Sequence, residues 1–242
     1  MFSDLWFIFI IICFIAMGTK DRFFYRLLAC LIGWLPLDVW TQEADYTTWA
    51  KMKVEYKVRK RLDVSTGLEW RTKNNLSMTD RWGLDVGAKY DLLPCLKIGT
   101  GYEIHYRNRG EEGWKFRHRY HMDGTVSGQW LRWKFSLRER FQHTFNSEEK
   151  EFRLRSRLKM AYDIARCKLE PYVSVEMYNG LGKSEHFDIK RMRYRGGVSF
   201  PLAESWEAEA FYCRQWEADA RKNIFGVECI YKLSLIHISE PT

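Results

Sequence analysis

The sequence predicts an all-β protein: a closed, antiparallel, up-and-down transmembrane β-barrel of about 10–12 strands. Apolar and polar residues alternate with a period of two in segment after segment of residues 45–232, and no segment there has a convincing helical period. The segments reach about 11–16 residues, whereas strands of soluble domains centre on about 5 or 6. Aromatic residues make up 16% of the 242-residue chain and charged residues 29%, so the two kinds are expected on different faces.

The first four alternating segments follow one rule. One face carries mainly Val, Leu, Ile, Met, Trp or Tyr, and the other carries mainly Lys, Arg, Asp, Glu or Gly. Such alternation predicts strands with one apolar and one polar face. In chain order the segments are 50–58, 63–71, 81–90 and 96–107.

The next three segments have polar faces that are mainly basic. These segments are 114–130, 133–145 and 151–163. The third is the clearest, because large apolar residues lie between most members of a cationic row that consists of Arg153, Arg155, Arg157 and Lys159. Three polar residues interrupt the apolar faces of the other two segments: His118, Glu139 and His143.

The polar faces of the last four segments mix signs: 173–178 and 206–212 are partly acidic, 191–200 is basic, and 225–232 carries Glu228 and Lys232. Turns are predicted near residues 59–61, 92–94, 165–166 and 201–202. Longer loops are predicted near residues 108–113, 146–150 and 179–185. Alternation of short turns with longer loops is typical of an up-and-down meander.

The sheet is expected to close, because an open edge in lipid leaves backbone groups unpaired at several kcal/mol each. The apolar faces then meet acyl chains, and the charged faces enclose a polar lumen. A soluble barrel would reverse this arrangement and is disfavoured by the strand lengths and the aromatic-rich apolar faces. Bacterial single-chain barrels have an even number of strands. Eleven segments therefore leave open whether a twelfth strand is hidden or one segment lies outside the barrel.

Both ends of the chain differ from the barrel region. Residues 1–41 are expected to be a signal-peptide region, with basic residues before the apolar run 27–37 and a cut before Gln42. Translation is expected to start at Met17, and a genuine N-terminal membrane anchor is the alternative. Residues 42–232 are then the barrel, and residues 233–242, LSLIHISEPT, resemble the translation of a sequencing-library adaptor.

Cysteines and net charge exclude some classes of function. The six cysteines form no CxxC pair and have no nearby pair of histidines, so neither a zinc site nor another cofactor is expected. Cys213 and Cys229 would approach each other only if their strands pair, and a disulfide is not favoured. The net charge of +8 suits an anionic partner, but interleaved acids and the lack of a binding motif argue against nucleic acid. The expected partners are membrane lipids and small anionic solutes, and the oligomeric state is left open.

A family resemblance rests on three stretches: WKFRHRYHMDGTVSGQWLRWKFSLRERFQHTF (residues 114–145), EFRLRSRLKMAYDI and CKLEPYVSVEMYNGL. They resemble the uncharacterised outer-membrane β-barrel family known as domain of unknown function 2490. The opening ADYTTWAKMKVEYKVRKRLDVSTGLEWR is similar to the start of that family, and the likeness spans about residues 45–232. The resemblance implies a location in the outer membrane of a Gram-negative bacterium and no established activity.

The polar faces supply a set of residues predicted to line the lumen: Arg117, Arg119, Arg138, Arg140, Arg153, Arg155, Arg157, Lys159, Glu176, Arg191, Arg193, Arg195, Glu207 and Glu209. Cross-strand pairs among them are sterically available, and Arg is suited to bidentate binding of carboxylates. In the favoured interpretation these pairs fill a narrow barrel and hold its shape. In the second, a cationic wall gives a narrow, weakly anion-selective pore, and that wall consists of Arg138, Arg140, Arg153, Arg155 and Arg157.

The alternative function is a membrane-embedded lipid hydrolase. His118, Glu139 and His143 share the apolar parity of their strands, where ionisable groups are expensive against lipid. No serine stands out beside them in the sequence, so no catalytic residue is assigned and no enzyme is expected.

Overall fold

The computed structural model describes residues 45–146, 150–182, 188–218 and 220–234. The predictions of a signal-peptide region at 1–41, of a start at Met17 and of an adaptor-like end at 233–242 lie outside the described residues, apart from Leu233 and Ser234 of that end. Among the described elements, the helical one is a short 3-10 helix, η3 (Gly110–Glu112). No helix in the described ranges is long and apolar enough to cross a membrane.

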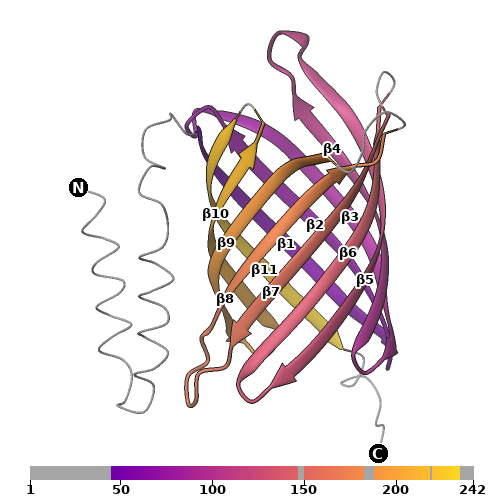
Figure 1. Cartoon of the computed structure of the whole chain (residues 1–242), viewed down its shortest axis with the longest axis vertical. Coiled ribbons are helices and arrows are strands. Elements are labelled where there is room, and N and C mark those ends of the chain that lie inside the picture. The colour runs from indigo at the N-terminus through magenta and orange to yellow at the C-terminus, as the bar shows by residue number, and fades with distance from the viewer. Residues whose placement is uncertain (1–44, 147–149, 183–187, 219, 235–242) are drawn as a thin grey trace, which may run out of the picture. The chain divides into compact units, whose positions relative to one another are not determined.

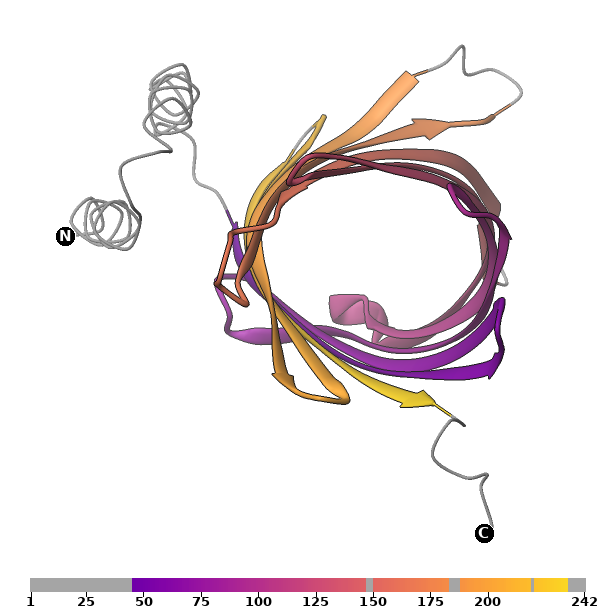
Figure 2. The same cartoon turned by 90° about the horizontal axis from the view of Figure 1, so that it is seen from below.

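Eleven strands form one closed barrel, and Figure 1 shows them crossing its wall at a tilt while Figure 2 shows them as a ring. The predicted fold class and all eleven alternating segments are confirmed. Every described strand is part of the ring, so the suggestion that one segment lies outside it is wrong. The strands are β1 (Asp45–Arg59), β2 (Leu62–Lys73), β3 (Met78–Leu93), β4 (Leu96–Asn108), β5 (Trp114–Trp130), β6 (Trp133–Phe145), β7 (Lys150–Tyr162), β8 (Glu170–Gly180), β9 (Asp188–Ala203), β10 (Trp206–Glu217) and β11 (Arg221–Ser234).

The barrel closes by a parallel pairing of β1 with β11, in register from Asp45 opposite Lys222 to Lys57 opposite Ser234. In a meander each strand reverses the direction of the one before, so an odd number of strands gives the first and last the same direction. Consecutive strands are antiparallel throughout, as predicted. The closing pair is therefore the one parallel pair of the described barrel, and parallel pairing is slightly less stable per residue.

Connections at one end of the barrel are short, as the sequence predicts, except that β7 and β8 are joined there by the longer segment 163–169. Two-residue turns join β1 to β2, β3 to β4, β5 to β6 and β9 to β10. The turn predicted at residues 201–202 is misplaced, because β9 continues to Ala203. Pro201 pairs with Glu207 next to a register shift at Trp206, and such an irregularity tolerates a residue without an N–H group.

Side chains are arranged in the opposite way to those of a soluble protein. The outward face is apolar: Met122 is 63% exposed and Leu68 is 61% exposed. The inward face is polar: Glu176 is 1% exposed and Arg193 is 6% exposed. Charged side chains are almost never fully buried unless they are paired. The barrel interior must therefore supply partners for its charges.

Aromatic rings gather on the outward face towards both ends of the strands. Near the two-residue turns, ring centroids 4.8 Å apart join two pairs, Trp133–Tyr162 and Trp206–Tyr231. Near the opposite end the ring pairs are Trp70–Trp82, Tyr106–Trp114 and Tyr194–Trp216. Between the two belts, exposed aliphatic side chains include Leu84, Leu137 and Val175. The outer surface therefore has an aliphatic middle between two aromatic belts.

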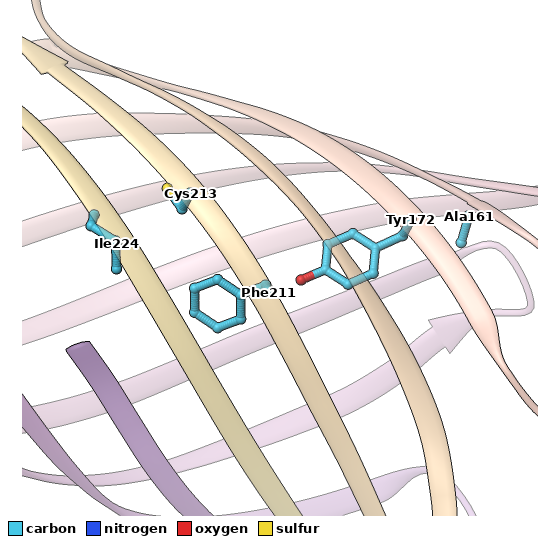
Figure 3. Close-up of a cluster of buried hydrophobic side chains, with 5 residues drawn as sticks. All are labelled: Ala161, Tyr172, Phe211, Cys213 and Ile224. Carbon is cyan, nitrogen blue, oxygen red and sulfur yellow. The ribbon is translucent and has the colours of Figure 1, made fainter. Parts of the chain in front are cut away.

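A small apolar cluster interrupts the polar interior beside β10 and β11. It consists of Ala161, Tyr172, Phe211, Cys213 and Ile224, which Figure 3 shows as sticks. Cys213 lies opposite Ile224, and Cys229 lies opposite Ala208. All four described cysteines are free, so the two strands pair without joining Cys213 to Cys229. The lumen is thus not polar throughout.

Gly226 makes room for the ring of Phe211. A Cβ atom added at Gly226 would clash with Cζ of Phe211, whereas a Cβ atom at Gly124 would meet nothing within 4 Å. We expect Gly226→Ala to lower the free energy of unfolding by about 1–3 kcal/mol through overpacking. Urea titration of the folded barrel in detergent measures it.

Gly124→Ala is the matched control and should leave the unfolding midpoint nearly unchanged. Adding Phe211→Ala to Gly226→Ala should reduce the overpacking penalty, because the atom that clashes is removed. Equal midpoints for the two glycine variants would contradict the packing described for Phe211.

Candidate functional site

Inward side chains from all eleven strands line a cavity of about 330 Å³. Its wall carries thirteen Lys and Arg residues but only seven Asp and Glu residues. The strands position these groups simply, because every second residue of a strand points to the same face. The cavity is therefore a strongly cationic compartment inside the barrel.

Glu176 on β8 is the most deeply buried carboxylate of the interior. Its Oε1 atom lies 2.6 Å from Nη2 of Arg155, and its Oε2 atom lies 3.7 Å from Nη1 of Arg193. Arg157 approaches Oε1 to 4.0 Å, and the hydroxyl of Tyr178 donates to Oε2 at 3.2 Å. Three arginines on β7 and β9, the two strands that flank β8, thus converge on one carboxylate.

Glu103 on β4 is a second centre. Its Oε2 atom lies 3.0 Å from Nη1 of Arg119 and 3.0 Å from Nε2 of His105. Its Oε1 atom lies 3.4 Å from Nδ1 of His121 and 3.8 Å from Nη1 of Arg140. His105 shares β4 with Glu103, whereas Arg119 and His121 lie on β5 and Arg140 lies on β6.

Two further carboxylates complete the ionic lining. Glu69 lies 2.7 Å from Arg71 and 2.9 Å from Arg81. Glu209 accepts a hydrogen bond from the hydroxyl of Tyr172 and lies 3.7 Å from Arg195. Each of these four carboxylates therefore has at least two cationic or hydrogen-bonding partners, as buried charges require.

Aromatic rings inside the barrel hold some of the cations. The guanidinium carbon of Arg71 lies 3.6 Å from the ring centroid of Trp49, and that of Arg195 lies 4.0 Å from the centroid of Phe211. The ammonium of Lys159 lies 3.8 Å from the ring centroid of Tyr172. Cations over ring faces are attracted by the ring quadrupole. Sequence reasoning missed these inward rings, although their parity along the strands places them on the polar face.

Four arginines on β6 and β7 face one another, and we call them the arginine block: Arg138, Arg140, Arg155 and Arg157. Arg138 lies directly opposite Arg157, and Arg140 lies directly opposite Arg155. Like charges in such positions are destabilising. Arg140 is 2.9 Å from Asp123, and Arg155 is paired with Glu176. In the described part of the chain, Arg138 has no carboxylate within ion-pair distance.

The predicted lumen residues fall into two groups. Those on the cavity wall are Arg119, Arg138, Arg140, Arg155, Arg157, Lys159, Arg193, Arg195 and Glu209, with Glu176 buried among the arginines. The others pair outside it. Arg117 and Arg153 both bind Glu151, and Arg191 lies 2.7 Å from Glu217. Glu207 pairs with Lys232 beside a separate cavity of about 200 Å³.

The outward face holds one polar pair that sequence reasoning missed. Ser156 lies directly opposite Glu139, and its hydroxyl donates to the Glu139 carboxylate at 2.7 Å. No serine stands out beside Glu139 in the sequence itself, because Ser156 lies on a different strand, and strand register is the signal that could have revealed the pair.

His143 lies apart from this pair. It stacks on Phe152, with ring centroids 4.1 Å apart, and neither of its ring nitrogens has a hydrogen-bond partner. Ser156, Glu139 and His143 are thus not joined as a nucleophile, base and orienting acid would be. No group of three or more ligating side chains in the described residues could hold a metal ion.

Removing the charge of Glu176 should destabilise the barrel strongly. Glu176→Gln leaves three buried guanidinium groups without their carboxylate, and breaking a buried pair costs about 3–5 kcal/mol. Glu207→Gln is the control, because its pair with Lys232 is more exposed and is worth at most about 1 kcal/mol. Urea unfolding in detergent should separate the two variants. Similar losses in both would show that the interior network is not a stability centre.

Comparisons with known proteins give a family and a fold. None of the curated proteins matches the chain. One solved structure, described as "Unveiling the Mechanism Behind the in-meso Crystallization of Membrane Proteins", is 11% identical over 76% of this chain and 80% of that chain, with a TM-score of 0.37. The translocator domain of autotransporter NalP from Neisseria meningitidis is 11% identical over 69% and 72%, with a TM-score of 0.38.

These two likenesses carry no argument about function. A family model matches residues 46–225, which include nearly the whole barrel. The resemblance read from the sequence is thereby confirmed: the chain belongs to the family described as "Protein of unknown function (DUF2490)".

Proposed function

We propose that this protein is an outer-membrane β-barrel whose cationic interior forms a narrow, weakly anion-selective pore. The membrane part of the proposal is supported by the outer surface. An aliphatic middle between two aromatic belts matches the hydrocarbon layer and the two interfaces that flank it. Closure of the sheet removes the unpaired backbone edges that lipid does not tolerate.

The pore part of the proposal is carried by one observation, the excess of thirteen cationic over seven anionic side chains around a cavity of about 330 Å³. Rings of Arg and Lys favour the entry of anions and repel cations. Selectivity is expected to be weak, because the carboxylates of Glu69, Glu103 and Glu209 lie on the same wall. The competing interpretation, in which ion pairs only fill and brace the lumen, predicts no conductance.

Position in the membrane can be tested on one strand. Met122 is at the middle of β5 and Trp130 is its last residue, and both are exposed. Arg at the bilayer midplane costs about 2–4 kcal/mol, falling to about 0–1 kcal/mol near the interface. Met122→Arg should therefore lower the free energy of unfolding in lipid vesicles far more than Trp130→Arg. Equal tolerance of the two arginines would count against a lipid-facing outer surface.

Conductance tests the pore directly. Purified protein in a planar bilayer under a KCl gradient should give small steps whose reversal potential indicates a preference for chloride. Arg157→Gln should weaken that preference, because Arg157 lines the cavity. Arg117→Gln should change it little, because Arg117 is paired with Glu151 away from the cavity. An absence of steps, or a preference for potassium, would rule out the anion pore.

A further inference from the structure

We infer that the arginine block is a binding site for a tetrahedral oxyanion, a phosphate or sulfate group on a small solute. This inference rests on the proposed function only in that it needs the cavity to be reachable by anions. An anion-selective pore does not by itself require a binding site for phosphate or sulfate groups.

The first support is the arrangement of the four guanidinium groups. Strands β6 and β7 pair so that arginine faces arginine at two successive inward positions. Directly opposite residues have Cβ atoms about 4.5–5.5 Å apart, and like charges at that spacing destabilise the sheet. All four side chains also line the cavity. The block is thus a compact cationic surface facing free space.

The second support is incomplete neutralisation. Arg140 and Arg155 have close carboxylates, at 2.9 Å from Asp123 and 2.6 Å from Glu176. Arg157 reaches Glu176 only at 4.0 Å. Arg138 lies between β5 and β7, where the opposing residues are Thr125 and Arg157. The directly opposed pair of Arg138 and Arg157 therefore lacks a close carboxylate in the described structure.

The rest of the wall does not supply the missing charge. Lys89 lines the same cavity, and its partner Glu55, 3.6 Å away, is already 2.6 Å from Lys53. Cations outnumber acids around the cavity as a whole. Water can hydrate the guanidinium groups, but it cannot neutralise them. An anion from solution can do both.

The chemistry of arginine selects the kind of anion. The guanidinium fork donates two parallel hydrogen bonds to phosphate or carboxylate oxygens, and this bidentate geometry gives specificity beyond simple charge attraction. A tetrahedral group presents oxygens in several directions, so it can be shared by forks that converge from two strands. Chloride offers only a point charge. At about 330 Å³, the cavity is at the low end of the range for ligand sites, which favours a small solute over a polymer.

Calorimetric titration of the folded barrel in a phosphate-free maltoside detergent tests the inference, with inorganic phosphate as the probe. The detergent excludes lipid headgroups, so added phosphate is the only source of that group. Phosphate should bind about tenfold more tightly than chloride at equal ionic strength, a difference of about 1.4 kcal/mol. Sulfate should behave like phosphate.

Two variants locate the site. Arg138→Gln should weaken phosphate binding about tenfold. The variant should still fold, because in the described structure no buried carboxylate loses its ion-pair partner when Arg138 is replaced. Arg138→Lys keeps the charge but loses the planar guanidinium fork, so its affinity for phosphate should lie between those of Arg138→Gln and the wild type. Arg117→Gln, which removes a cation paired with Glu151, should leave binding unchanged.

The inference fails if wild-type protein binds phosphate no better than chloride, or if Arg138→Gln and Arg117→Gln bind it equally. Anion conductance with no preference for phosphate would overturn the oxyanion site and leave the pore standing. Phosphate binding that depends on Arg138, in a protein without conductance, would support the site and overturn the pore.

Discussion

Enclosure of charge by a sheet without open edges is the constraint on which this structure depends. Glu176, at 1% exposure, is tolerable only because the register of β7, β8 and β9 brings Arg155, Arg157 and Arg193 around it. A shift of one residue in any pairing would turn that strand's charges outward and its apolar residues inward. The strand register, the closure of the sheet and the separation of its polar and apolar faces therefore depend on one another.

The same constraint explains why cations and acids are distributed unevenly inside. Acids occur as separate centres that draw cations from nearby strands, as Glu103 does from β5 and β6. The β6–β7 pair sets arginine opposite arginine at two successive inward positions, and like charges also lie opposite each other elsewhere in the wall, as Arg71 and Arg81 do. Those two arginines share Glu69, whereas Arg138 has no carboxylate within ion-pair distance in the described structure. We take that missing neutralisation as a sign that the block serves a ligand.

Much of the fold could be predicted from the sequence, because alternation is a local property. Alternation alone predicts the bounds of β5 and β6, residues 114–130 and 133–145, correctly. Parallel closure could not be predicted, because it depends on how many strands the ring contains and not on any one segment. Most of the cavity wall followed from parity as well, and so did the cationic character of β6 and β7. The interaction partners of individual side chains could not be predicted from parity. Ser156 contacts Glu139, and Arg191 contacts Glu217, because of the strand register and the reach of the side chains, which the local sequence does not encode.

The proposed membrane barrel requires that adjacent residues of a strand point to opposite faces of the wall. His121 and Met122 are adjacent on β5, the first 8% exposed and the second 63% exposed. Spin labels placed by His121→Cys and Met122→Cys, each in a background free of native cysteines, can be compared in lipid vesicles by their accessibility to oxygen and to a water-soluble nickel chelate. The account predicts that the label at 122 meets oxygen in the hydrocarbon and that the label at 121 avoids it. A label at 122 that is relaxed by the nickel chelate, with 121 in an oxygen-rich apolar interior, would contradict the account.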